Sequence, residues 1–387
     1  MVLLEGSHDF ATWSINPRPI RVMVIAGGRS GEHEVSLSSA RSIISASSTL
    51  PNFSFSVQVI THEGRWLSEK DSFRVLDAEG SYCDGHPPIP LSHLTEQCDV
   101  VFPIIHGPFG EDGTLQGFLE IIDIPYVGCR VLASALCKDK AMAKQVLRTN
   151  DIPLVKHILV TRDSYKQNPT AALQHASQLD GPWFVKPDNL GSSIGVSKVT
   201  EESALPKAIE EALEYDRRVL VEEAVANVRE LELAVLGNHA PQTSSVGEVI
   251  YAAEFYDYKT KYSGDKTHFQ IPADLPEIVA AKVEALALKV YQLLDCSGFA
   301  RVDFFYDNIT GAVYFNEINT FPKFARESMF ARLWEARGVS YLQLIEKVVN
   351  LALENRSLKG FRRKGIEFDS CTENCCGKVG ARAIHIC

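Results

Sequence analysis

Four polar residues that suit metal and phosphate chemistry share one predicted β-hairpin. Alternating apolar residues predict two strands, joined by an Asn/Asp/Gly-rich turn centred on Ile309. Folding the chain there places Arg301 opposite Glu317, and Asp303 and Asn319 then lie one diagonal step away. Carboxylate and amide oxygens suit Mg²⁺ shared with phosphate, and an arginine holds a phosphate or a developing oxyanion. The hairpin alone is equally compatible with a partly buried ion pair, so other segments must decide between the two interpretations.

A lysine and a glycine-rich loop form a second candidate phosphate site. Lys186 ends a predicted strand, residues 191–195 read Gly-Ser-Ser-Ile-Gly, and a further strand is predicted at 196–199. Small residues let backbone amides and hydroxyls approach a phosphate closely. Because this loop joins two strands, it is a flap over a ligand and not a P-loop that opens a helix. We therefore prefer a phosphate-binding flap to a simple hairpin.

Three more lysines and two acids flank these segments. One helix is predicted over 133–149, and it carries Lys138, Lys140 and Lys144. Lysines on a helix usually face solvent, but the neighbouring flap favours a role in binding phosphate. The strand predicted at 218–223 ends in two glutamates. These accept hydrogen bonds from an adenine amino group or a ribose hydroxyl, or they are surface charges; the segment alone leaves both interpretations open.

The N-terminal part of the chain predicts a parallel sheet with loops at one edge. The apolar run 20–26 predicts a buried strand, and Glu32 lies just before a predicted helix. The Gly-Gly turn between them is a plain strand-to-helix connection, because the chain has no GxGxxG or GxxxxGKS/T motif. Segment 106–117 has four glycines, one His and two acids. We interpret it as a ligand-lining loop.

Composition restricts the class of protein. The 387 residues are 45% hydrophobic and 23% charged, which is typical of a soluble globular protein of two or three domains. The net charge of -10, without a long basic stripe, argues against nucleic acid as a partner. No apolar run reaches the roughly 20 residues of a membrane span, and no secretory signal opens the chain. We therefore expect no membrane partner and a cytoplasmic protein. Nine scattered cysteines predict buried thiols and not a disulfide framework.

Six motifs, in this order, resemble the ATP-grasp superfamily and, closely, its D-alanine:D-alanine ligases. Six matches in family order are far more specific than any one alone, and together they cover roughly residues 21–358. The matching segments are GGRSGEHEVS (27–36), HGPFGEDGTLQG (106–117), KPDNLGSSIGVS (186–197), EFYDYKTKY (254–262), ARVDFF (300–305) and NEINTFP (316–322).

The resemblance implies an α/β, three-domain ATP-grasp fold, with the nucleotide held between the central and C-terminal sheets. It also implies ATP and two Mg²⁺ (or Mn²⁺) ions as cofactors, D-alanine as substrate, and suggests a homodimer. On this basis we divide the chain into three domains: an N-terminal substrate domain with a parallel sheet (20–128), a central domain (129–226) and a C-terminal domain with the metal site (227–358). Residues 1–19 are a flexible extension, and residues 359–387 are a cysteine-containing tail that we expect to be disordered.

The activity that the resemblance implies is ATP-dependent ligation of two D-alanines through an acyl phosphate, for peptidoglycan precursor synthesis. Segment VEEAVANVRE carries an insertion relative to the family's usual spacing between the adenine and ribose acids, so either of two neighbouring glutamates can be the adenine acceptor. By resemblance, phosphate is bound by Lys140, Lys186 and the flap residue Ser193, adenine by Glu222 or Glu223, and ribose by Glu230. The metal ions are bound by Asp303, Glu317 and Asn319, and the first substrate by Glu32, Ser192 and Tyr262. Lys186 and Lys261 neutralise the charge that moves during transfer, Arg301 holds the tetrahedral oxyanion, and His106 and Ser328 make further substrate contacts.

The segment after Pro322 departs from the family pattern. Lys323 stands where a glycine is usual, Ala325 stands where a small hydroxyl residue is usual, and Arg326 adds charge. A positive φ at Lys323 would cost about 1–2 kcal/mol. Two alternatives to the D-alanine ligase therefore stand: a dipeptide ligase with a different second amino acid, and a nucleotide-binding regulator with little or no ligase activity.

Overall fold

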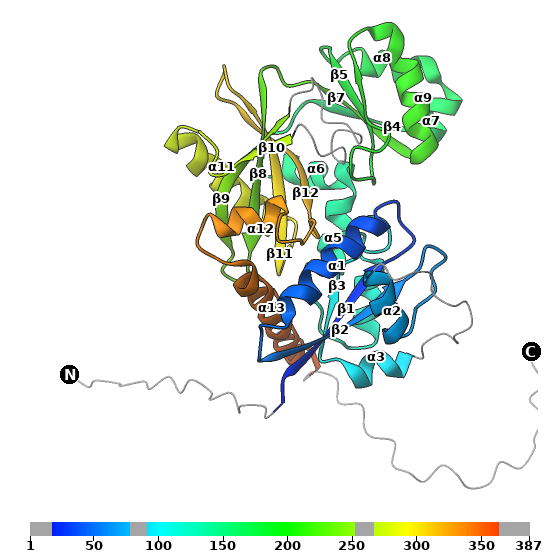
Figure 1. Cartoon of the computed structure of the whole chain (residues 1–387). Coiled ribbons are helices and arrows are strands. Elements are labelled where there is room, and N and C mark those ends of the chain that lie inside the picture. The colour runs from blue at the N-terminus through cyan, green and yellow to red at the C-terminus, as the bar shows by residue number, and fades with distance from the viewer. Residues whose placement is uncertain (1–17, 78–90, 252–266, 364–387) are drawn as a thin grey trace, which may run out of the picture.

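A computed structural model describes residues 18–77, 91–251 and 267–363, which form three sheets with helices packed against them (Figure 1). The N-terminal elements are β1 (Ile20–Gly27), α1 (His33–Ser47), β2 (Phe53–Ile60), α2 (Glu69–Leu76), α3 (Leu91–Gln97), β3 (Val100–Pro103) and α4 (Thr114–Ile121). Their sheet is parallel, as predicted, with strand order β2-β1-β3. The apolar residues of β1 are buried because a central parallel strand is covered on both faces.

The central sheet is antiparallel and carries the glycine flap (191–195) between two of its strands. The elements are β4 (His157–Thr161), α7 (Arg162–Gln167), α8 (Pro169–Ala176), β5 (Trp183–Pro187), β6 (Ser197–Val199), the 3₁₀ helix η1 (Glu202–Ala204), α9 (Leu205–Tyr215) and β7 (Arg218–Glu223). The strand order is β4-β7-β5-β6, and residues of α8 and α9 share a hydrophobic core with these strands. The predicted strand-loop-strand arrangement of the flap is thus confirmed.

The third sheet has five antiparallel strands in the order β10-β9-β8-β11-β12: β8 (Val228–Leu236), β9 (Gln242–Tyr251), β10 (Thr267–Gln270), β11 (Phe299–Asp307) and β12 (Val313–Asn319). The helices α5 (Val131–Lys138), α6 (Lys140–Arg148), α11 (Glu277–Leu293) and α12 (Met329–Glu335) accompany this sheet, and α13 (Tyr341–Arg363) packs against α12 and against β3 and α1 of the N-terminal part. Residues of α5, α6 and α11 share one core with β8, β11 and β12. The predicted domain boundaries stay predictions, although α13 runs past the expected end at residue 358.

The single helix predicted over 133–149 is wrong, because the structure has two helices that meet at Asp139. The Asp139 backbone is extended, and its side chain accepts a hydrogen bond from the Met142 amide, 3.0 Å away. The same carboxylate pairs with Arg218 of β7. This contact comes from a distant strand, so helical periodicity alone does not reveal the break. As a result, Lys140 opens a new helix.

The predicted register of the β11–β12 hairpin is also wrong. Arg301 lies opposite Asn319, and Asp303 lies opposite Glu317. The register shifts between Asp303 and Phe304, which pair with Glu317 and Phe315, so Asn316 is one extra residue on β12. The centre of the hairpin consequently lies past Ile309. The bulge therefore places the two carboxylates directly across from each other.

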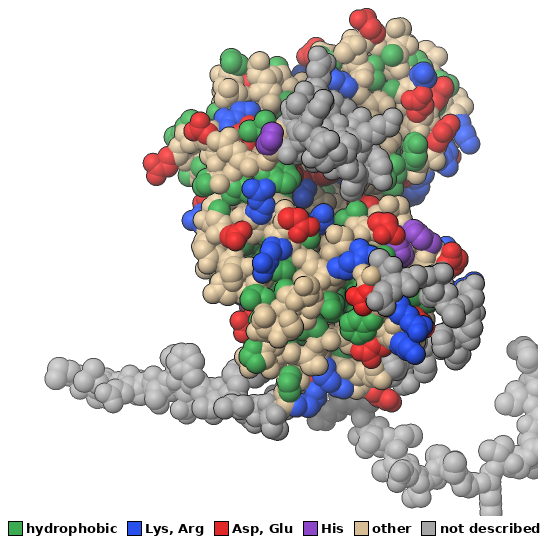
Figure 2. Space-filling view, viewed as in Figure 1, with side chains coloured by type: hydrophobic (Ala, Val, Ile, Leu, Met, Phe, Trp, Pro, Cys, Tyr) green, Lys and Arg blue, Asp and Glu red, His purple; other side chains and the backbone are tan. Residues whose placement is uncertain are grey.

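The outer surface fits the expectations from composition. Acidic and basic side chains are interspersed on the visible face, without one large basic region (Figure 2). Among the helices of the described residues, none is long and apolar enough to cross a membrane. The four described cysteines, Cys98, Cys129, Cys137 and Cys296, are buried free thiols, as predicted. The cysteine-containing tail lies outside the described residues.

Candidate active site

Three lysines and two glutamates meet between the central sheet and the third sheet. Lys186 of β5 lies 2.6 Å from one oxygen of Glu222 on β7, and Lys144 of α6 lies 3.0 Å from the other. Lys140 lies 3.4 Å from Glu317 on β12, and it donates a hydrogen bond to the Leu190 carbonyl beside the flap. The flap, α6 and the β11–β12 hairpin are therefore joined by cations that a phosphate ligand can share.

Burial controls the charge of this cluster. Burial lowers the pKa of Lys140 and Lys144, although neighbouring carboxylates oppose that effect. Burial by itself would raise the pKa of Glu222, but Lys144 and Lys186 outweigh it and lower that pKa to about 2. Glu222 is thus held ionised among the lysines.

Glu222 and Glu223 have different environments because consecutive residues of a strand point to opposite faces. Glu222 is only 2% exposed and faces the lysines. Glu223 instead contacts Lys156 at 3.0 Å and accepts a hydrogen bond from the Asp180 amide. The arrangement favours Glu222 as the acid that faces a nucleotide.

The predicted metal ligands form part of a row of carboxylates across three strands. Asp303 lies directly between Glu232 of β8 and Glu317 of β12. Arg301 lies opposite Asn319, whereas the predicted register had put it opposite Glu317. It forms two hydrogen bonds to Asp303, of 2.8 and 2.7 Å, and lies 3.0 Å from Glu232. The Asn319 amide donates to Asp303 at 3.3 Å. Asp303, Glu317 and Asn319 thus offer adjacent hard oxygens, which fits Mg²⁺.

Glu230 lies on the same strand face as this row. It is two residues from Glu232 on β8, so strand alternation turns both carboxylates to the side that Arg301 contacts. Glu230 is half-buried and pairs across the ladder with Phe305. This position is compatible with the predicted ribose acceptor.

Glu32 and Ser192, which are predicted to bind the amino-acid substrate, lie in contact although they are distant in the sequence. Glu32 precedes the first turn of α1, and the Ser192 hydroxyl of the flap donates a hydrogen bond to its carboxylate. Ser192 and Ser193 both have positive φ values, 52° and 57°, so the flap turns sharply where it reaches α1. Lys261 and Tyr262, the other residues expected here, lie outside the described residues.

His106 is held in a chain of polar contacts behind this meeting point. Its Nε2 lies 3.2 Å from the Ser39 hydroxyl, and its Nδ1 lies 3.1 Å from the Phe321 carbonyl and 3.5 Å from Glu111. Glu111 in turn lies 2.6 Å from Lys138. His106 therefore connects α1, the loop after β3 and the loop after β12.

Glu111 and Glu232 were missed as site residues by sequence reasoning, and Lys138 was noted only as one of three lysines on a predicted helix. Burial lowers the pKa of Lys138, but nearby Glu111, Glu32 and Glu317 outweigh it and raise that pKa. The available signal for Glu111 was its place in the glycine-rich loop 106–117. Lys138 was a weaker candidate, because a lysine on a helix usually faces solvent. Only the fold shows that its side chain is largely buried against Glu111.

Ser328 caps α12, where its hydroxyl accepts a hydrogen bond from the Ala331 amide at 3.4 Å. Lys323 is not among the described residues with positive φ, so the strain considered for it is absent. The Lys323 side chain is 44% exposed and lies 3.9 Å from Glu327. Arg326 lies over the Tyr341 ring, 5.9 Å from its centroid. The loop charges thus have partners within the loop and on α13.

We expect acid to destabilise this site between about pH 4.5 and about pH 2. Burial would raise the pKa of Glu111, but Lys138 and His106 lower it to about 2. The pKa of Glu222 is likewise lowered to about 2, by Lys144 and Lys186. Carboxylates with a lowered pKa in the folded state stabilise it above their ordinary value of 4.5, and this contribution is lost as pH falls through about 2. Urea unfolding at several pH values should give a shallower pH dependence for Glu111→Gln than for the exposed control Glu277→Gln. Equal slopes would contradict the assignment.

Two family models and two relatives that match this sequence are all described as D-alanine–D-alanine ligases. A family model described as "D-ala D-ala ligase N-terminus" matches residues 21–129, and "D-ala D-ala ligase C-terminus" matches residues 146–350. The chain is 45% identical over 339 residues to the D-alanine--D-alanine ligase of Deinococcus radiodurans, which covers 87% of this chain and 99% of that protein. It is 42% identical over 371 residues to the enzyme of the same name from Acetivibrio thermocellus, covering 88% and 98%.

Solved structures agree with these sequence relatives. The VanG D-Ala:D-Ser ligase of Enterococcus faecalis superposes with a TM-score of 0.76 at 34% identity, covering 87% of this chain and 100% of that one. The D-alanine-D-alanine ligase of Coxiella burnetii superposes with a TM-score of 0.74 at 33% identity, covering 90% and 97%.

Proposed function

Because the chain belongs to the D-alanine–D-alanine ligase family, we propose that it uses ATP to join two D-alanines through an acyl phosphate, for peptidoglycan precursor synthesis. The observation that carries the proposal is the hydrogen bond between Ser192 and Glu32, which joins the flap to α1 beside the lysine cluster. An acyl phosphate hydrolyses in water, so its formation requires a flap that closes over both the amino acid and the phosphate. From the family we also propose a cytoplasmic homodimer.

The first step activates a carboxylate. Glu32 and Ser192 hold the first D-alanine by its ammonium group, so its carboxylate faces the lysine cluster. One carboxylate oxygen attacks the γ-phosphorus of ATP, the bond to the bridging oxygen breaks, and ADP leaves. Lys140 and Lys186 hold the phosphates, exchanging their present partners Glu317 and Glu222 for phosphate oxygens.

The second step forms the amide. The neutral amine of the second D-alanine attacks the acyl carbon, phosphate leaves with the electrons of the acyl-oxygen bond, and the proton lost by the nitrogen passes to the departing phosphate. Arg301 faces the oxyanion that develops on this carbon. Two Mg²⁺ (or Mn²⁺) ions, when bound by Asp303, Glu317 and Asn319, supply positive charge that neutralises phosphate oxygens. Glu222 and Glu230 bind adenine and ribose, and the flap amide and hydroxyl of Ser193 bind phosphate.

D-Alanine is the better-supported second substrate. From the family resemblance we assign its carboxylate to Ser328, which caps the amino end of α12, and His106 contacts the Phe321 carbonyl in the loop that leads to Ser328. Lys323 lies 3.9 Å from Glu327 and Arg326 lies over the Tyr341 ring, and D-aspartate tests whether these two charges select an acidic amino acid. A different second amino acid remains the second candidate function, with D-serine as its test substrate because VanG is named for it.

Product analysis distinguishes these functions. We would incubate the protein with ATP, Mg²⁺ and D-alanine, with or without D-serine or D-aspartate, and measure ADP and dipeptides. The proposal predicts ADP release on D-alanine alone, with D-alanyl-D-alanine as the main product. A mixed dipeptide as the main product would favour the second candidate. ATP binding without ADP release on any amino acid would favour a nucleotide-binding regulator.

We also infer a role for Lys138, which lies between the site of the first D-alanine and the metal site. It contacts Glu111 and lies in a small cleft that Gly191 of the flap and Glu317 also line. Glu32 and Glu317 contribute to its raised pKa, so its charge acts on both the first-substrate end and the metal end of the site. Lys138 is therefore a positioning residue that attracts the first D-alanine carboxylate toward the γ-phosphate.

Replacing Lys138 by methionine should lower kcat/KM for D-alanine by about tenfold while the KM for ATP changes little. The side chain keeps its volume and loses its charge, so Glu111 is left with His106 alone. Lys138→Arg should recover most of the loss, and the exposed Lys282→Met is the matched control. The double variant with Glu111→Gln separates a stability defect from the electrostatic effect. An unchanged kcat/KM in a folded Lys138→Met protein would remove Lys138 from the site.

A further inference from the structure

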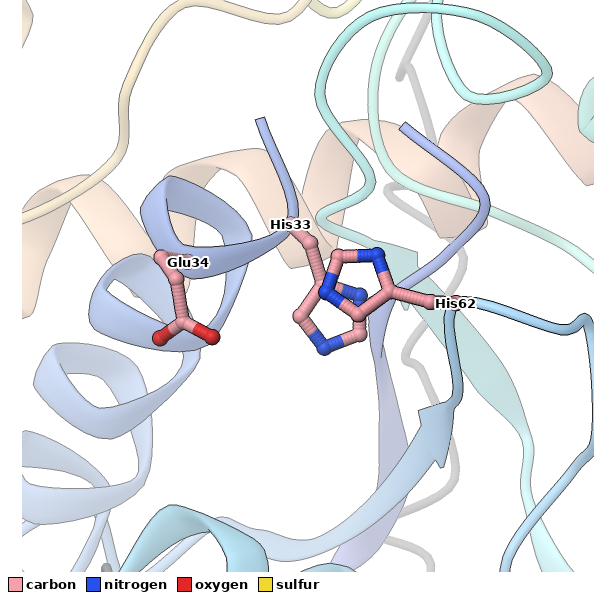
Figure 3. Close-up of side chains that lie close together, drawn as sticks. All are labelled: His33, Glu34 and His62. Carbon is pink, nitrogen blue, oxygen red and sulfur yellow. The ribbon is translucent and has the colours of Figure 1, made fainter. Parts of the chain in front are cut away.

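Two histidines and a carboxylate lie together at the edge of the N-terminal sheet, outside the proposed ligase site. His33 and Glu34 open α1, and His62 follows β2. One ligand atom from each of the three lies within 4.8 Å of the others. Figure 3 shows the two rings lying over each other with Glu34 beside them, and their centroids are 3.9 Å apart with an angle of 23° between the planes. We propose that this cluster binds a borderline divalent cation of the zinc class.

The hydrogen bonding of His33 prepares one ring nitrogen for a metal. Its Nδ1 lies 2.8 Å from the carbonyl oxygen of Gly28. A carbonyl only accepts, so Nδ1 carries the proton and Nε2 keeps its lone pair. Metal-binding histidines are commonly oriented by such a bond from the other ring nitrogen. His33 is also buried, so its ring is a fixed ligand.

The other two ligands can move to complete the geometry. A tetrahedral zinc site with bonds of roughly 2.0–2.1 Å places its ligand atoms about 3.4 Å apart. The present separations, all within 4.8 Å, therefore close by shifts of about 1 Å. The His62 ring must also turn out of its stack on His33, because an imidazole lone pair lies in the plane of its ring. Glu34 and His62 are exposed, so rotamer changes supply these shifts without altering the core. Water can occupy the fourth position.

The donor set determines which cation is bound. Two imidazoles and one carboxylate favour Zn²⁺, Ni²⁺ or Co²⁺, whereas Mg²⁺ prefers oxygen ligands alone. The positive end of α1 opposes a cation, and the negative charge of Glu34 offsets that repulsion. The bound ion would join the end of β2 to the first turn of α1, next to Glu32. The binding inference itself does not depend on the proposed ligase activity.

Cobalt is the sharpest probe, because its absorption reports its ligands. The tail thiols at Cys371, Cys375, Cys376 and Cys387 also attract such ions, so the full chain should carry serine at these four positions. Excess Mg²⁺ occupies the oxygen site of the β11–β12 hairpin. Under these conditions we expect one bound Co²⁺ per chain, with visible d–d absorption and without thiolate charge-transfer absorption.

Variants in this background test the ligands. His62→Ala should weaken Co²⁺ binding by at least about tenfold, and Glu34→Gln should weaken it less. His175→Ala, which removes an exposed histidine on α8, is the control and should bind like its parent. Because His62 is exposed, its replacement should leave the fold intact, and circular dichroism of the variant checks this. Absence of bound cobalt in the parent chain, or equal affinity in the parent and His62→Ala, would overturn the proposal. Zn²⁺ should displace the cobalt from the parent chain.

Discussion

Turnover of the Glu317→Gln variant should fall by about 100-fold or more, while its fold and thermal stability stay close to those of the parent. Glu317 lies across from Asp303 in the carboxylate row and 3.4 Å from Lys140. The amide keeps the shape of the side chain and removes its charge, so a Mg²⁺ ion loses an anionic ligand. Metal charge stabilisation is worth several kcal/mol, and about 1.4 kcal/mol corresponds to tenfold in rate.

Steady-state ADP release at increasing Mg²⁺ concentration is the measurement for this variant. Part of the lost turnover should return at high Mg²⁺ if binding is weakened, and the apparent Mg²⁺ requirement should rise. Glu277→Gln, an exposed residue at the start of α11, is the matched control. Parental turnover with a parental Mg²⁺ requirement in Glu317→Gln would refute the metal assignment.

The largest stability effect should come from Arg301→Met, which we expect to cost about 3–5 kcal/mol of unfolding free energy. Arg301 makes two hydrogen bonds to Asp303 and lies 3.0 Å from Glu232. These carboxylates lie on adjacent strands, so removal of the guanidinium leaves a buried and a half-buried like charge side by side. Catalysis should be lost as well.

A double-mutant cycle in urea separates these contributions. Combining Arg301→Met with Glu232→Gln should restore part of the stability, because one of the uncompensated charges is gone. Arg337→Met is a suitable control, since Arg337 pairs with Glu284 at the surface and such pairs contribute little. Strict additivity of Arg301→Met and Glu232→Gln would show that the two residues do not interact.

The fold was predictable where patterns are local. The apolar run of β1, the alternation in β11 and the small residues of the flap each determine their own element, and the family resemblance supplied their order. The break at Asp139 and the bulge beside Asp303 were not predictable in this way. The break at Asp139 accompanies an ion pair with Arg218 on the distant strand β7, and the bulge depends on how β11 and β12 pair.

The candidate site shows the same division. The motifs contain Glu32, Ser192 and Lys186, and the structure brings Glu32 to Ser192 and Lys186 to Glu222. Their roles in binding the amino acid and the phosphate stay predictions. Lys138 and Glu111 belong to different elements, and no spacing rule connects them. Their pairing arises from the packing of α5 against the loop after β3, which only the assembled fold defines.

Transfer of oxygen from substrate to phosphate tests the acyl phosphate route most directly. D-Alanine labelled with heavy oxygen in its carboxyl group would be incubated with ATP, Mg²⁺ and the protein, and mass spectrometry would follow phosphate and dipeptide. We predict one heavy oxygen in each released phosphate and three in each D-alanyl-D-alanine, because the first D-alanine gives up one carboxyl oxygen. Dipeptide formed with unlabelled phosphate, or ADP released without dipeptide, would contradict the account.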